Sequence, residues 1–220
     1  MTDIRQPLLL SLQIALVATA LVTVVTIPLA LLMSRRQFAG KSVAEALITL
    51  PLVLPPTVVG YFIIATLGAR GWLGQWLNRW FGYSIVFRFE GAVLASAIVA
   101  LPLLYMPAKA AFSSVERESE DLARTFGANA LQTFWHVTLP LARRGILSGL
   151  LLAFARALGE FGATMMVFGW QPARLTLPIS VYADYDAGEM SRAGGAVVAL
   201  SVISLVLILA YNHSGASKQE

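Results

Sequence analysis

The sequence predicts an all-α fold, a polytopic membrane helix bundle of about five transmembrane helices. Apolar residues make up 57% of the 220 residues and charged residues only 13%, which is far from the composition of a soluble domain. The charges also fall in clusters. The uncharged stretches between them are long enough for a helix to cross the hydrocarbon layer, which takes roughly 20 residues. The length fits one domain, 1–220.

Four of the predicted spans coincide with stretches that carry no charged side chain. The stretches are 6–34, 46–69, 91–108 and 193–217, and we place the spans near 8–33, 46–69, 91–111 and 193–212. A secretory signal is the alternative for the first stretch, because residues 18–20 match a small-residue cleavage pattern. The chain stays apolar as far as Met33, where a secreted domain would turn polar, and this favours a span.

The second span contains two adjacent prolines, Pro55 and Pro56, inside its apolar run. Each proline removes a helix hydrogen bond, and in lipid the freed carbonyl must find another partner. The two prolines therefore predict a bend in this span. Two interpretations stay open, because the bend either serves packing alone or marks a pathway or gate through the bundle.

The fifth span, near 145–168, differs from the others because it carries Arg156 and Glu160. At a rise of about 1.5 Å per residue, the two side chains lie roughly 17 and 22 Å into the span, within the bilayer. Their i, i+4 spacing places them on one helix face, where they can pair. They form either a self-neutralising structural pair or a direct gate or anion contact. Gly159 and Gly162 are expected to let neighbouring helices approach closely.

The basic residues predict the orientation of the chain in the membrane. Arg35, Arg36 and Lys41 share the first loop, and short basic loops favour the cytoplasm. The N-terminus and segment 71–90 are then expected outside, and segment 113–144 inside.

The outer segment carries Trp72, Trp76 and Trp80, which are four residues apart and therefore lie on one side of a helix. Tryptophan concentrates at the headgroup level of a bilayer, so we expect a short amphipathic helix in the outer interface. A surface that stacks on a ligand is the alternative.

The longest predicted cytoplasmic segment, 113–144, has the pattern of two short helices. In the first helix, acidic residues between Glu116 and Asp121 suit the positive N-terminal end of a helix dipole. Gly127 suits a left-handed cap at the C-terminal end of that helix.

Asn129 and Gln132 have the spacing of a capping box for the second helix, which we expect to end before Pro140. Its large apolar residues are Leu131, Phe134, Trp135 and Val137. Isolated helices this short are marginally stable, so the segment indicates an interaction surface for a partner. The alternative is that both helices pack on the chain's own spans.

The spacing of residues 121–140 resembles the EAA loop of binding-protein-dependent ABC importer permeases. That family has Glu-Ala-Ala, three residues, Gly, nine residues, then Ile, any residue, Leu and Pro. The matching positions are Asp121, Leu122, Ala123, Gly127, Val137, Leu139 and Pro140, with Asp for Glu, Leu for Ala and Val for Ile. The resemblance implies a type I ABC importer transmembrane domain in which these residues form a coupling loop that docks on an ATPase subunit.

Two further runs resemble one branch of this family. Residues 156–163 are similar to the sulfate and molybdate permeases, and residues 50–61 are more similar to the molybdate permeases. The resemblance implies a multi-pass permease subunit that carries molybdate across the cell membrane, which is the inner membrane in a Gram-negative cell. Sulfate or tungstate is the alternative cargo. The implied partners are two ATPase subunits, a second copy of this chain that completes a homodimer, and an extracytoplasmic molybdate-binding protein.

Other functions require residues that are scarce or missing here. The chain has no cysteine and no Walker glycine loop, so we expect no thiolate metal site, and ATP must be hydrolysed by a partner. His136 and His213 lie outside the predicted spans, which argues against an intramembrane enzyme. We expect no catalytic residue, metal or cofactor in this chain. The sequence shows no basic patch with interleaved aromatics, so we expect no nucleic acid partner. A structural membrane subunit without its own pathway is the remaining alternative.

Overall fold

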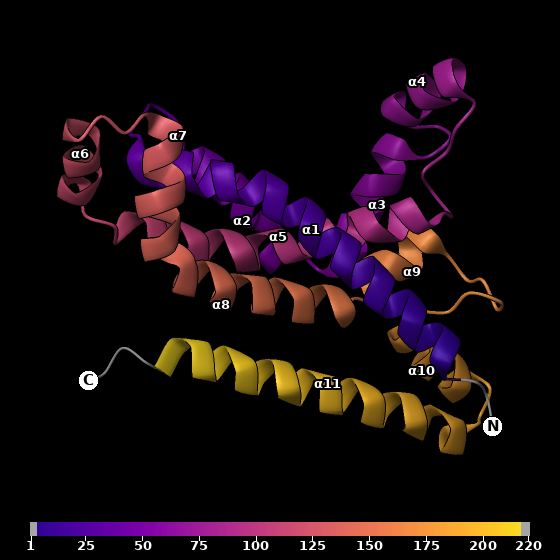
Figure 1. The fold of residues 1–220 in the computed structure, drawn as a ribbon. Coiled ribbons are helices and arrows are strands. Elements are labelled where there is room, and N and C mark those ends of the chain that lie inside the picture. Colours follow the sequence, from indigo (N-terminus) through magenta and orange to yellow (C-terminus); the bar gives the residue numbers. More distant parts are fainter. Residues whose placement is uncertain (1–3, 217–220) are drawn as a thin grey trace.

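The structure is a computed structural model that describes residues 4–216 of the chain. Within this range every regular element is helical and no strand occurs (Figure 1). The predicted all-α fold class is therefore confirmed.

Four helical runs in the described range are long and apolar enough to cross a membrane. They are α1 (Arg5–Arg35), α5 (Phe89–Ser113), the run Ala130–Leu158, and α11 (Met190–Ala216) over Met190–His213. A fifth candidate is the pair of α2 (Lys41–Val53) and α3 (Pro56–Leu67), which meet at an angle of 114°. The second predicted span is thus bent at its two prolines, as expected.

The run Ala130–Leu158 combines three elements: α7 (Ala130–Thr133), the π-helical turn η1 (Phe134–Thr138) and α8 (Leu139–Leu158). The remaining helices are short. They are α4 (Trp72–Phe81), α6 (Arg117–Thr125), α9 (Gly162–Phe168) and α10 (Leu177–Asp186). None of the predicted elements included α10, which begins after Thr176 with Pro178 in its first turn.

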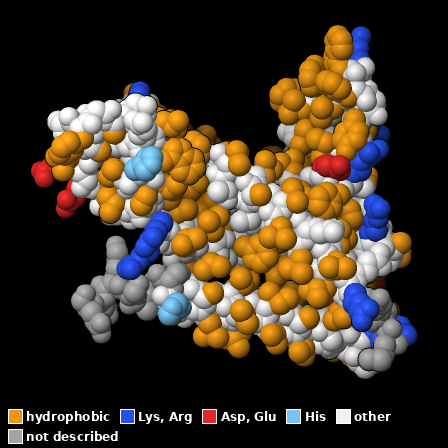
Figure 2. All heavy atoms as spheres, viewed as in Figure 1, with side chains coloured by type: hydrophobic (Ala, Val, Ile, Leu, Met, Phe, Trp, Pro, Cys, Tyr) orange, Lys and Arg blue, Asp and Glu red, His pale blue; other side chains and the backbone are white. Residues whose placement is uncertain are grey.

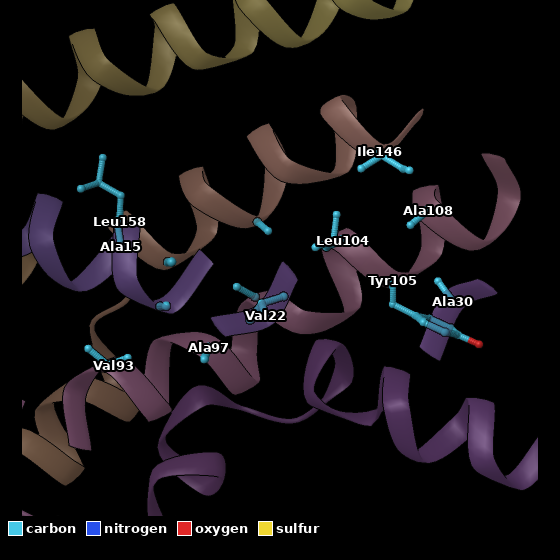
Figure 3. Packing of buried hydrophobic residues seen from close by; sticks show 14 of the residues in the cluster. Ala15, Val22, Ala30, Val93, Ala97, Leu104, Tyr105, Ala108, Ile146 and Leu158 are labelled. Atoms are coloured by element: carbon cyan, nitrogen blue, oxygen red, sulfur yellow. The ribbon is translucent and has the colours of Figure 1, made fainter. Parts of the chain in front are cut away.

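The centre of the bundle is α5, which packs on α1 and α8. Its contact faces include many small residues, such as the buried Ala97 and Ala108, beside the larger Leu104 (Figure 3). On the facing helix, a Cβ atom at Gly145 would lie 2.6 Å from the Cβ of Ala111. Small residues let the helices approach closely, which is how helices gain packing energy in a membrane, where water no longer drives them together.

The predicted helix in the segment 71–90 is present as α4, which stands away from the main bundle beyond α3 (Figure 1). Trp72, Trp76 and Trp80 are all exposed on it. The buried residue of this helix is Gly74, whose Cβ would meet the carbonyl oxygen of Gly68 at 2.0 Å, so α4 folds tightly against the end of α3. The aromatic side of α4 is therefore free to meet a membrane or a partner.

The least buried of the four long candidate spans is α11, which packs on α8 and α10. Val198, Val202 and Leu205 on this helix are all more than half exposed. On the face drawn in Figure 2, charged side chains gather towards the two ends of the long helices and hydrophobic ones lie between. This distribution suits a protein whose middle is surrounded by lipid.

The fifth predicted span, 145–168, is not one continuous helix. The helix α8 ends at Leu158, and α9 begins at Gly162 after a three-residue break. The sequence pattern did not predict this break, which forms because the buried carboxylate of Glu160 binds the backbone of the next helix, as described below. The chain thus contains two broken helices in the membrane region, α2–α3 and α8–α9.

Candidate functional site

The predicted coupling segment, 113–144, begins with α6. Glu118 and Glu120 lie in the first turn of α6, where negative charge is favoured by the helix dipole. The helix ends at a turn in which the N–H of Gly127 donates to the carbonyl of Arg124 at 2.9 Å. Gly127 has a φ of +89°, so the predicted left-handed cap is confirmed. A Cβ at Gly127 would meet nothing within 4 Å, so only the backbone conformation selects glycine.

The predicted capping box is also present at the start of the following helix. The N–H of Gln132 donates to Oδ1 of Asn129, and the N–H of Asn129 donates to Oε1 of Gln132, both at 2.9 Å. The two side chains satisfy backbone donors that would otherwise be unpaired at a helix start.

The second helix does not end before Pro140, and this prediction was wrong. The chain passes through the π-helical turn η1 directly into α8, with Pro140 in the first turn of α8. At the junction the N–H of Leu139 reaches back five residues to the carbonyl of Phe134. Because the turn is widened, a proline that lacks an N–H continues the helix. The second helix of the coupling segment and the membrane helix α8 therefore form one continuous helical run, which bends where η1 meets α8 (Figure 1).

Glu120 ties the coupling segment to the bundle. Its Oε1 accepts a hydrogen bond from Nη2 of Arg35 at 2.6 Å and one from the hydroxyl of Thr138 at 2.7 Å. The same arginine donates through Nη1 to the carbonyl of Val115 at 3.2 Å. One buried carboxylate thus joins α6 to the end of α1 and to η1. We refer to Arg35, Glu120 and Thr138 as the Glu120 anchor.

The sequence pattern did not identify this anchor. Glu120 stands in a run of acidic residues, and nothing local separates it from Glu118 or Asp121. Its main partner, Arg35, is 85 positions away. Asp121, the position that matches the family motif, is instead exposed and pairs with Arg124 at 3.3 Å within α6.

The predicted coupling residues divide into two groups. Asp121, Leu122, Gly127 and Pro140 are exposed, whereas Ala123, Val137 and Leu139 are half-buried. Beside them the structure leaves Phe126 85% exposed and Leu131 67% exposed. Phe134 and Leu139 pack against the core of the bundle. The segment is therefore seated on the chain's own helices through one side and presents an apolar surface on the other.

The first helix break lies between α2 and α3, where Leu54 and Pro55 adopt extended backbone with ψ values of 139° and 134°. Pro56 then starts α3, a position where its missing N–H costs no helix hydrogen bond. This is the bend that the two prolines predicted.

The second break, between α8 and α9, is held by Glu160. Arg156 and Glu160 form the predicted pair, with Nη1 and Oε2 at 2.6 Å. The other carboxylate oxygen of Glu160 accepts the N–H of Ala163 at 2.7 Å. Only 1% of the Glu160 side chain is exposed, against 29% for Arg156. Both charges suit the dipoles of their helices, because Arg156 lies in the last turn of α8 and Glu160 precedes α9.

The two breaks lie against each other. A Cβ at Gly162 would lie 3.1 Å from the Cβ of Pro56, and a Cβ at Gly60 would lie 2.7 Å from the Cβ of Met166. The hydroxyl groups of Ser96 on α5 and Thr164 on α9 are 3.5 Å apart in the buried contact behind them. Helices α3 and α9 therefore pack almost backbone to backbone.

Gly159 plays a different part from the one predicted. A Cβ there would meet only the carbonyl of Ala155, at 3.6 Å, within its own helix. The residue ends α8 and makes no close approach to another helix of this chain in the described residues. Close approach is confirmed for Gly162.

The coupling segment and the two breaks lie at opposite ends of α8 (Figure 1). This helix has 20 residues and spans about 30 Å. It begins beside the Glu120 anchor and ends at the Arg156–Glu160 pair. The helical run Ala130–Leu158 thus connects the coupling segment to the breaks.

Comparisons with known proteins place the chain in a family. The model of the family described as "Binding-protein-dependent transport system inner membrane component" matches residues 26–214. The molybdenum transport system permease protein ModB of Haemophilus influenzae is 40% identical over 191 residues, covering 83% of each chain. ModB of Escherichia coli K12 is 39% identical over 207 residues, covering 92% of this chain and 90% of the relative. The sulfate transport system permease protein CysW of Synechocystis is 35% identical over 94% of this chain and 75% of the relative.

A solved structure shares the fold. A chain of a bacterial alginate ABC transporter, in complex with a periplasmic protein, matches with a TM-score of 0.72 at 17% identity. The match covers 97% of this chain and 78% of that one. The family resemblance of residues 121–140 thus agrees with the match over most of the sequence. The chain belongs to the binding-protein-dependent transport system inner membrane components and is a membrane permease of an ABC transporter.

Proposed function

We propose that this chain is the membrane-spanning subunit of a molybdate importer driven by ATP hydrolysis in a separate subunit. The observation that carries the transport role is the unbroken helical run Ala130–Leu158, which leads from the coupling segment to the broken helices. The cargo follows from the relatives, because two molybdenum permeases are 39–40% identical over at least 83% of this chain. The sulfate permease, at 35% identity, makes sulfate the second candidate.

The partner on the cytoplasmic side is an ABC ATPase. The exposed residues Leu122, Phe126 and Leu131 form an apolar surface of the kind that a groove on another protein would cover. The complex would hold two ATPase subunits and two copies of this chain, with a molybdate-binding protein on the outer side. Five candidate spans are few to enclose a pathway, which supports the homodimer. The location is the cell membrane, the inner membrane in a Gram-negative cell.

In this mechanism ATP-driven closure of the ATPase pair moves the docked coupling segment as a rigid body. The Glu120 anchor carries the movement to α1, and η1 carries it to α8. At the far end of α8 the packed breaks α2–α3 and α8–α9 then move relative to the second copy of the chain. Glu160 acts as a positioning residue that holds the break, while Arg156 keeps part of its guanidinium accessible for an anion.

The test is transport by the reconstituted complex. The chain, its ATPase and the molybdate-binding protein are placed in vesicles, and ATP-dependent uptake of molybdate is followed. We expect uptake that tungstate reduces more than sulfate does at equal concentration. Absence of uptake with a competent binding protein contradicts the importer role, and stronger competition by sulfate contradicts the cargo.

A further inference from the structure

Two adjoining cavities lie between the C-terminal half of α1 and the run of elements from α6 to α8. The first has a volume of 380 Å³ and is lined by three guanidinium groups and one carboxylate. These belong to Arg35, Arg36, Arg124 and Glu120. The balance of charge in this cavity is positive.

The second cavity is an apolar groove of 570 Å³ between α1 and the η1–α8 run. Val24, Ile27 and Leu139 contribute to its walls. Both cavities share Pro28, Leu31 and Phe134 as lining residues. The basic cavity therefore continues into the apolar groove along α1.

The groove faces the surface that meets lipid. Val24 in its wall is 73% exposed, and Val25 and Leu147 next to it on α1 and α8 are half exposed. Trp135 also lines the groove and is exposed, and it follows Phe134, which lines both cavities. Tryptophan at the junction of an apolar and a charged region is typical of the headgroup level. The groove thus runs from the membrane interior to the interface.

The three arginines of the basic cavity differ in whether a carboxylate pairs with them. Arg35 is held by Glu120 at 2.6 Å, and Arg124 contacts Asp121 at 3.3 Å. Arg36 is exposed and has no carboxylate within ion-pair distance among residues 4–216. It can meet an anion without breaking the Glu120 anchor.

We propose that the groove binds an anionic phospholipid of the leaflet on the coupling-segment side. An acyl chain lies in the apolar groove between α1 and α8, and the phosphate lies at Arg36, with Arg35 and Arg124 beside it. A basic pocket that opens into an apolar groove between membrane helices matches a charged headgroup joined to a hydrocarbon chain. The lipid would lie between α1 and the η1–α8 run, which carries the proposed coupling movement.

The test uses the assembled complex in nanodiscs and phospholipids with brominated acyl chains, which quench nearby tryptophan. The quenching assigned to Trp135 is the difference between the wild-type complex and the Trp135→Phe complex. We expect brominated phosphatidylglycerol to quench Trp135 at lower mole fractions than brominated phosphatidylcholine. Arg36→Gln should raise the mole fraction of brominated phosphatidylglycerol needed for quenching about fivefold. One basic residue near an anionic membrane surface contributes a factor of about this size to binding. Val24→Phe, which narrows the groove without adding a tryptophan, should weaken quenching by both lipids.

The matched control is Arg143→Gln, which removes an exposed arginine of α8 outside both cavities and should change nothing. Equal quenching by the two lipids, or equal effects of Arg36→Gln and Arg143→Gln, would overturn the proposal. So would displacement of the lipid by inorganic phosphate alone, which would indicate a site for a free anion. The measurement needs no cargo, so its failure is separate from failure of the proposed transport role.

Discussion

At the scale of single residues, two neighbouring acids on α6 have opposite environments. Asp121 matches the family motif yet 69% of its side chain is exposed, whereas Glu120 has 12% exposed and holds two partners from other elements. A sequence motif marks positions that a partner meets. It does not mark the side chain that fastens the motif to its own scaffold, because that contact depends on how α1 returns to the segment.

Glu120→Gln should loosen the coupling segment without removing it from the membrane. The change deletes a charge-assisted hydrogen bond to Arg35, and we expect a loss of about 1–2 kcal/mol in stability. Glu118→Gln on the same turn is the control, because that side chain is exposed. The measurement combines the thermal midpoint of the purified chain with the amount of molybdate imported per ATP. Equal midpoints for the two variants would show that the Glu120 anchor is not a structural tie.

Gly127→Val should abolish docking on the ATPase while the chain still inserts. A β-branched residue at a φ of +89° is strained, and the left-handed conformation costs roughly 1–2 kcal/mol for an ordinary L residue. Gly127→Asn should retain most of the docking, because asparagine visits this conformation more readily. Co-purification with the ATPase and ATP-dependent uptake are the measurements. If valine docks as well as asparagine, the turn geometry is not what glycine supplies.

At the scale of elements, the long spans could be predicted because lipid imposes a simple rule. A helix that crosses hydrocarbon must stay apolar for about 20 residues, and the stretches 6–34 and 91–108 obey it. The bend at Pro55 and Pro56 was predictable for the same kind of reason, since proline cannot donate.

No comparable sequence signal marks the break at residues 159–161. No proline lies there, and the helix ends because the Glu160 carboxylate binds the N–H of Ala163 while paired with Arg156. The i, i+4 spacing correctly predicted the pair but not the end of the helix. The short helix α10 was missed because ten residues with mixed polarity resemble a loop when read without their tertiary contacts.

Gly60→Ala should push α3 and α9 apart. The added methyl would lie 2.7 Å from the Cβ of Met166 and 3.1 Å from the carbonyl oxygen of Ala163, and the backbone cannot yield easily. We expect a loss of about 1–3 kcal/mol, the usual range for overpacking. Gly194→Ala on α11 is the control, since nothing lies within 4 Å of that position. A lower thermal midpoint for the first variant only is the expected result, and similar midpoints would argue against tight packing of the breaks.

At the scale of the whole molecule, two groups of contacts lie at opposite ends of α8. One end is the coupling segment, fastened to α1 through the Glu120 anchor. The other is the pair of packed breaks at the far end of α8, joined to α5 through small residues and the Ser96–Thr164 contact. The proposed lipid groove lies at the first of these ends. We therefore expect the lipid composition of the bilayer to change how firmly the coupling segment is held to α1, independently of the cargo.

The π-helical turn at Phe134–Thr138 fixes an angle as well as a connection. In an α-helix each residue turns the side-chain direction by about 100° around the axis. The widened π-helical turn holds one residue more than an α-helical turn does. The faces that α8 turns towards α5, with Gly145 and Gly149, are set relative to the docking surface by this offset. Removing one residue from the α-helical turn Ala130–Thr133, where no widened turn absorbs the loss, would rotate α8 by about 100° relative to the docking surface and turn both glycines away from their partner. The length of this segment is therefore under a rotational constraint that its loop-like position in the sequence does not suggest.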